Sequence, residues 1–153
     1  MEFRGIYVVR QAITNPGAIT LLQIKAGASN PFKLLRAWVS QTPSTTSAQL
    51  DIQILRKSGA ATVTSFTPLL LRPSDPAANA VGGASATGYT ATGEGTDGDL
   101  LIQEGFNILN GYLYLPVPEE RIVVPVAGII GLKFAIAGGN FTFKCGMIFG
   151  ELG

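Results

Sequence analysis

The chain has 153 residues and a formal net charge of +1, with 46% hydrophobic but only 14% charged residues. This length suits one domain with a hydrophobic core of its own, so we expect residues 1–153 to form a single domain. The basic residues are scattered singly and histidine is absent, which argues against nucleic-acid binding and against histidine-dependent catalysis or metal binding.

Strands are predicted along most of the chain, because apolar and polar residues alternate in short segments bounded by glycine, proline, asparagine and serine. A turn at residues 15–17, Asn-Pro-Gly, separates the first two segments, and no segment has a helical period. The predicted strands are residues 5–13, 18–26, 32–40, 50–54, 100–103, 111–115, 121–126, 129–137 and 141–150. Their number and spacing favour an all-β fold, specifically a β-sandwich of the jelly-roll type.

The last predicted strand, residues 141–150, is apolar at every second position, so one of its faces must pack on the core. The single cysteine, Cys145, lies on that face, where we expect it to act as a small buried side chain. Gly138, Gly139 and Asn140 predict a tight hairpin turn directly before this strand.

Residues 73–99 are predicted as a long glycine-rich loop or arm, because small and polar residues dominate this segment. It follows a structured motif in which two prolines fix φ and Arg72 is placed to pair with Asp75. The motif is interpreted either as a rigid strand exit or as a corner that directs the arm into a neighbouring subunit. On the second interpretation, the candidate interface residues here are Arg72, Pro73, Ser74, Asp75, Pro76 and Tyr89.

No catalytic, cofactor or metal site is predicted, and we expect the chain not to be an enzyme. Glu94, Asp97, Asp99 and Glu104 lie close together in the sequence, yet they lack the spaced ligand array of a calcium loop. The serines have no histidine to activate them. Aromatic residues are candidates for a sugar site or for interface anchors: Trp38, Tyr89, Tyr112 and Tyr114, of which Tyr112 and Tyr114 join the candidate interface residues.

The low charge indicates assembly with other subunits. Charged residues make up 14% of the chain, against about 25% in an average protein, so they cannot cover its whole surface. We infer that part of this surface is buried against other subunits. No apolar stretch approaches the roughly 18 residues needed to span a membrane, and no signal peptide is recognised at the start.

Five sequence elements occur in a characteristic order: residues 50–56, residues 67–69 with 74–78, residues 104–107, residues 114–119 and residues 141–151. In this order they resemble a family of virion structural proteins of tailed bacteriophages and prophages, over about residues 30–153. The chain departs from the family pattern at Leu113 and Tyr114, which stand at the family's tryptophan position, and in its more glycine-rich arm.

The resemblance implies a capsid decoration or cement protein, a β-sandwich on the capsid surface of a virion that is assembled in the host cytoplasm. The implied partners are further copies of the chain in a homotrimer and the major capsid protein, with no nucleic acid, no membrane and no cofactor. Two alternatives remain: a tail- or fibre-associated receptor-binding module, and an enzyme of the cupin kind. The absence of histidine argues against a cupin metal site.

Overall fold

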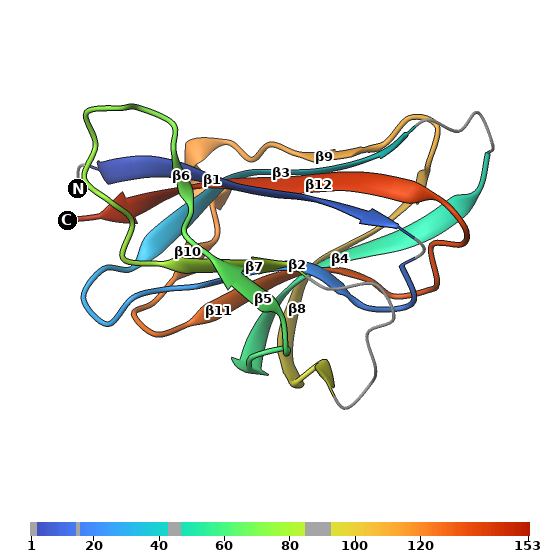
Figure 1. Cartoon of the computed structure of the whole chain (residues 1–153), viewed down its shortest axis with the longest axis horizontal. Coiled ribbons are helices and arrows are strands. Elements are labelled where there is room, and N and C mark those ends of the chain that lie inside the picture. The colour runs from blue at the N-terminus through green and yellow to red at the C-terminus, as the bar shows by residue number, and fades with distance from the viewer. Residues whose placement is uncertain (1–2, 15, 43–46, 85–92) are drawn as a thin grey trace.

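The computed structural model describes residues 3–14, 16–42, 47–84 and 93–153, which form two antiparallel sheets packed face to face (Figure 1). Sheet A contains, in spatial order, β10 (Val123–Val124), β3 (Phe32–Thr42), β12 (Thr142–Leu152), β1 (Phe3–Thr14) and β6 (Leu69–Leu70), with β9 (Tyr112–Tyr114) also paired to β3. Sheet B contains β5 (Thr64–Phe66), β7 (Val81–Ala84), β2 (Thr20–Lys25), β11 (Ile129–Phe134), β4 (Gln49–Gly59) and β8 (Thr96–Asn107). One 3₁₀ turn, η2 (Pro118–Glu120), follows β9. The predicted all-β sandwich is confirmed.

Strands that are distant in the sequence pair in a nested order. β1 pairs with β12, β2 with β11, β3 with β9 and β10, and β4 with β8. The pairs are joined by contact of β12 with β3 in sheet A and of β11 with β4 in sheet B. The first and last strands are therefore neighbours within sheet A (Figure 1), and Phe3 lies opposite Leu152.

Two local predictions are wrong. The hairpin turn predicted at residues 138–140 does not join neighbouring strands, because β11 lies in sheet B and β12 in sheet A. The loop predicted at residues 73–99 contains β7 and the first residues of β8. β7 escaped prediction because its central residues are glycines and show no alternation. A larger residue than glycine would not fit at this position, because a Cβ on Gly82 would lie 2.7 Å from the Val9 side chain of β1.

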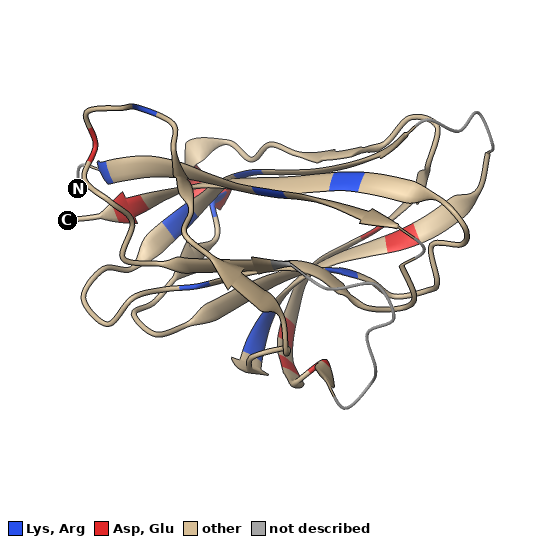
Figure 2. Cartoon of the chain, viewed as in Figure 1, with Lys and Arg blue, Asp and Glu red and all other residues tan. Residues whose placement is uncertain are grey.

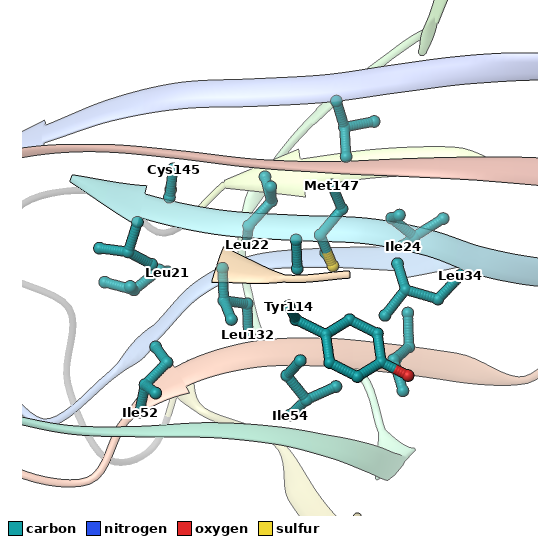
Figure 3. Packing of buried hydrophobic residues seen from close by; sticks show 14 of the residues in the cluster. Leu21, Leu22, Ile24, Leu34, Ile52, Ile54, Tyr114, Leu132, Cys145 and Met147 are labelled. Atoms are coloured by element: carbon teal, nitrogen blue, oxygen red, sulfur yellow. The ribbon is translucent and has the colours of Figure 1, made fainter. Parts of the chain in front are cut away.

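The core fills the space between the inner faces of the two sheets, as Figure 3 shows for part of it. In β12 the alternation is realised as predicted, with Phe143, Cys145, Met147 and Phe149 all buried. The Tyr7 ring of β1 lies 5.4 Å from the Phe149 ring, centroid to centroid, so β1 and β12 are also held together through their side chains. Burying each large apolar side chain contributes roughly 1.5–3 kcal/mol to the stability of the fold.

An insertion, residues 60–95, lies between the paired strands β4 and β8, and residues 60–84 and 93–95 of it are described. Its strands β5 and β7 extend sheet B beyond β2, and its strand β6 extends sheet A beyond β1. The insertion therefore runs from one sheet to the other along one edge of the sandwich (Figure 1).

A buried carboxylate holds the insertion against the terminal strands. The Glu151 side chain of β12 is fully buried, and its Oε1 accepts hydrogen bonds from the backbone N–H groups of Asn79 (2.8 Å) and Ala80 (2.7 Å). Its Oε2 accepts a hydrogen bond from the Arg4 guanidinium of β1 at 2.6 Å. Arg4 also donates to the backbone carbonyl of Ala77. Because a buried charge is tolerated only when it is paired and hydrogen-bonded, Glu151 fixes the path of the insertion.

Glu151→Gln tests this anchor. The amide cannot accept on both sides, so either the two insertion N–H groups or Arg4 would face a donor. We expect the free energy of unfolding in urea to fall by about 2 kcal/mol, the cost of leaving buried donors unpaired. Glu119→Gln, at an exposed position in η2, is the control. Equal effects of the two substitutions would contradict the anchoring role.

Candidate functional site

The predicted corner at residues 72–76 is docked on the protein's own β1. Arg72 Nε donates to Asp75 Oδ2 at 3.0 Å, which confirms the predicted pair. The same oxygen accepts the backbone N–H of Ile6 at 2.9 Å, and the Tyr7 hydroxyl donates to the carbonyl of the second proline. A contact of this corner with another subunit stays a prediction, and its exposed residues are Arg72, Pro73, Ser74 and Pro76.

Two of the three predicted interface tyrosines, Tyr112 and Tyr114, face inward. Tyr112 and Tyr114 lie opposite Val39 and Ala37 of β3, whose side chains point into the core. Tyr114 is buried within the chain itself, so its predicted role as a surface anchor is wrong. Tyr112 is partly buried against the core, and burial, with Glu104 nearby, raises its pKa to about 12. The third predicted interface tyrosine, Tyr89, lies outside the described residues.

Two of the four clustered carboxylates, Glu94 and Asp97, form ion pairs with the buried Lys57. Asp97 accepts hydrogen bonds from the buried Lys57 (2.7 Å) and from Lys133 (2.6 Å). Burial opposes ionisation of Asp97, but these two bonds outweigh it and lower its pKa below the ordinary 3.8. Glu94 accepts hydrogen bonds from the backbone N–H and the hydroxyl of Thr20. Over the described ranges, no group of three or more acidic, cysteine or histidine side chains is arranged to hold a metal ion.

An aromatic platform lies on the outer face of sheet A. Trp38 of β3 is directly opposite Gly146 of β12, and its indole lies across that glycine: a Cβ on Gly146 would be 2.2 Å from Trp38 Cζ2. Arg36 lies over the same ring, with its guanidinium carbon 5.1 Å from the ring centroid. Glycine at this position therefore allows the indole to lie flat across the central strand of the sheet.

Beside this platform is a groove at the free side of β1, which we call the β1 groove. Strand register sets its floor: Arg10 lies opposite Gly146, and Ala12 lies opposite Lys144, so these side chains share the outer face with Trp38. The segment that connects β5 to β6 forms its other wall. The groove has a volume of about 610 Å³, and its lining includes Val8, Arg10, Trp38, Phe66, Leu69 and Lys144.

The charges are divided unequally between the two sheets. Among the described strands of sheet A, the only acidic residue is the buried Glu151, whereas the basic residues are Arg4, Arg10, Lys33, Arg36 and Lys144. In the described strands of sheet B both signs occur: the acidic residues are Asp51, Asp97, Asp99 and Glu104, and the basic residues are Lys25, Arg56, Lys57 and Lys133. Figure 2 shows blue segments on β1 and β12, with red on β12 only near its end, and both red and blue segments among the strands of sheet B. Strand pairing thus gathers basic residues that are scattered in the sequence.

Cys145 lies next to this region but contributes no reactive thiol. Its side chain points into the core and is 1% exposed. Burial raises the pKa of the thiol to about 12, despite the hydrogen bond that it makes to the carbonyl of Gln11. A protonated, buried thiol is a poor nucleophile, so Cys145 acts as the core side chain that its position predicted.

Comparison of the chain with family models, with curated proteins and with solved structures found no match. No helix within the described ranges is both long enough and apolar enough to cross a membrane.

Asp97→Asn tests the ion-pair cluster through its pH dependence. Since the pKa of Asp97 is lower in the folded chain than in the unfolded chain, its carboxylate stabilises the fold above about pH 4 and ceases to do so as pH falls through the folded value. We expect the variant to lose about 0.5–1 kcal/mol near pH 7, a small effect because solvent screens a side chain that is 40% exposed. The loss should shrink as pH falls below about 4 in denaturant titrations, with exposed Asp99→Asn as control. A loss that is independent of pH would refute the assignment.

Gly146→Ala tests the platform. The added methyl group would force the Trp38 indole off the strand, so we expect a red-shifted Trp38 fluorescence spectrum and a stability loss of about 1–3 kcal/mol. Trp38 is the single tryptophan of the chain, which makes this signal specific. Gly105→Ala is the control, because its Cβ would meet nothing closer than 3.9 Å. An unchanged spectrum in Gly146→Ala would show that the indole does not lie across this glycine.

Proposed function

We propose that the chain is a virion structural protein, a non-enzymatic capsid decoration or cement subunit that binds and stabilises a bacteriophage head shell. The main supporting observation is that apolar side chains are exposed at both edges of sheet A. At the β6 edge Leu69 is 55% exposed, and at the β9 edge Leu113 and Leu115 are 54% and 67% exposed. Exposed apolar edge strands are sites where another chain can pair or pack.

These two edges also support a homotrimer. They differ in sequence, so contact between the β6 edge of one subunit and the β9 edge of the next is heterologous. Heterologous contacts generate a ring when the rotation between subunits closes. In a closed trimer every such leucine edge would be covered, and the outer faces of the sheets would remain available for the major capsid protein.

The nested strand pairing supports the finer fold prediction, a jelly roll. A jelly roll arises when one long antiparallel pair of strands folds over, so that four successive strand pairs are divided between two sheets. The observed pairs follow that order: β1–β12, β2–β11, β3–β9/β10 and β4–β8. Jelly rolls are common in viral capsid proteins but host many other functions. The proposal therefore rests on the apolar edges and on the ordered resemblance, with a location on the virion surface after assembly in the host cytoplasm.

A second candidate is a tail- or fibre-associated receptor-binding module. The observation that favours it is the β1 groove, which combines an aromatic platform with polar side chains, as sugar sites do. Of the aromatic residues proposed for such a site, Trp38 alone is placed there by the described structure. Glycan-array binding that is lost in Trp38→Ala, together with absence from purified heads, would favour this candidate over decoration.

Light scattering after size exclusion, combined with sedimentation of the chain with heads assembled without it, tests the proposal. The chain is expected to be a trimer and to bind these heads saturably. Leu113→Glu should yield monomers that bind the heads at least about tenfold more weakly, because a charge replaces an apolar contact in the interface. Ile136→Glu, at an exposed apolar residue away from both edges of sheet A, is the control. A stable monomer that never adheres to heads would refute the proposal.

A further inference from the structure

β1 has a backbone edge that is mostly unpaired. On one side β1 pairs with β12 from Phe3 to Thr14, but on the other side β6 reaches only Tyr7 and Val8. Among residues 3–14, 16–42, 47–84 and 93–153, no other strand pairs with β1 beyond Val8. A strand edge of this kind exposes N–H and C=O groups that can bond an added strand.

The direction of these groups follows from the contacts of Ile6. Its carbonyl accepts the N–H of Leu71, and its own N–H donates to Asp75, so its backbone groups point away from β12. Backbone groups alternate in direction along a strand, and those of Arg10 and Ala12 therefore point to the same open side. A guest strand can form hydrogen bonds with these two residues without disturbing the ladder between β1 and β12.

The side chains beside this edge select the guest by charge. Residues that pair across two strands project to the same face, so guest residues bonded to Arg10 and Ala12 would project into the β1 groove, next to Arg10 and Lys144. No carboxylate lies on the outer face of sheet A in its described strands. Acidic side chains at every second position of the guest strand would supply carboxylates to pair with Arg10 and Lys144.

A second copy of this chain that presents its own β1 edge does not fit the same place. Pairing of two β1 edges around a twofold axis would bring the two copies of Arg10 and Lys144 together, and like charges in contact oppose association. A nucleic acid would meet the basic side chains but cannot match the alternating donors and acceptors of a strand edge. The edge and the charges are both satisfied by an extended acidic peptide.

We propose that the open edge of β1 binds an extended segment of a partner protein by strand addition, with acidic side chains of that segment in the β1 groove against Arg10 and Lys144. β6 already shows the mode of binding, since it adds two residues antiparallel to β1 at the start of the same edge. This inference goes beyond the proposed function and does not depend on it, because it concerns the isolated chain and a peptide.

Trp38 fluorescence provides the test, because the only tryptophan of the chain lines the groove. The probe is an end-blocked peptide of alternating valine and glutamate, nine residues long. It should change the emission of Trp38 and bind more weakly as salt rises. A peptide with lysine in place of glutamate should not bind. The double variant Arg10→Glu, Lys144→Glu should bind the acidic peptide at least about tenfold more weakly, with folding checked by circular dichroism.

N-methylation of the peptide separates strand addition from simple charge attraction without altering the protein. In the proposed pairing the glutamate amides face β1 and the valine amides face away. Methylating the glutamate amides should abolish binding, whereas methylating the valine amides should preserve it. Equal effects of the two methylations, equal binding of the lysine peptide, displacement by oligothymidylate, or no binding at all would each overturn the inference. Failure to bind heads, by contrast, would overturn only the proposed function.

Discussion

The antiparallel pairing of β1 with β12 is the constraint on which the rest of the structure depends. It joins the two ends of the chain across the middle of sheet A and leaves the strands between them to pair inward in nested order. It also brings Arg4 to Glu151, whose carboxylate in turn holds residues 77–80 of the insertion. Further along, the same register sets Arg10 opposite Gly146. The fold, the path of the insertion and the β1 groove are therefore consequences of one strand pair.

On the side of the sandwich where the insertion lies, the outermost strand apart from those of the insertion is β2 in sheet B and β1 in sheet A. The insertion covers these two edges to different degrees. In sheet B, β7 and then β5 cover the edge of β2, and their close packing is possible because Gly82 and Gly83 leave room for neighbouring side chains. In sheet A, β6 covers only the start of the β1 edge. Charged side chains at an exposed strand edge commonly prevent pairing with another chain. Arg10 and Lys144 lie beside the β1 edge and can have this effect. The same charges that oppose pairing with a second copy would favour an acidic partner, so protection against self-association and recognition are compatible here.

Local alternation was sufficient to predict the all-β class, most of β1, β3 and β12 and the inward face of β12, because burial of every second residue is a local pattern. Of β4 and β8 it predicted only residues 50–54 and 100–103. Pairing partners are not local, and the hairpin turn predicted before β12 was wrong because a tight turn does not reveal that the chain changes sheets there. Tyr112 and Tyr114 lie two positions apart in a predicted strand and therefore share a face, but the pattern could not say that this face was the inner one. Trp38 was named as a candidate, whereas Arg10 and Lys144 were missed, since their neighbourhood depends on three strands distant in sequence. The anchoring role of Glu151 was equally inaccessible, because its partners come from β1 and the insertion.

The central claim is that sheet A, with its basic outer face and its incompletely covered edges, is the surface through which the chain assembles. Hydrogen–deuterium exchange of the chain, free and bound to heads assembled without it, tests this claim most directly. The account predicts slower exchange on binding at the Arg10 and Ala12 amides of β1 and no change in β8 at the far edge of sheet B. The amides of β9 should exchange slowly in both states, because the trimer contacts already cover that edge. Protection confined to sheet B, or no protection anywhere in the presence of heads, would contradict it.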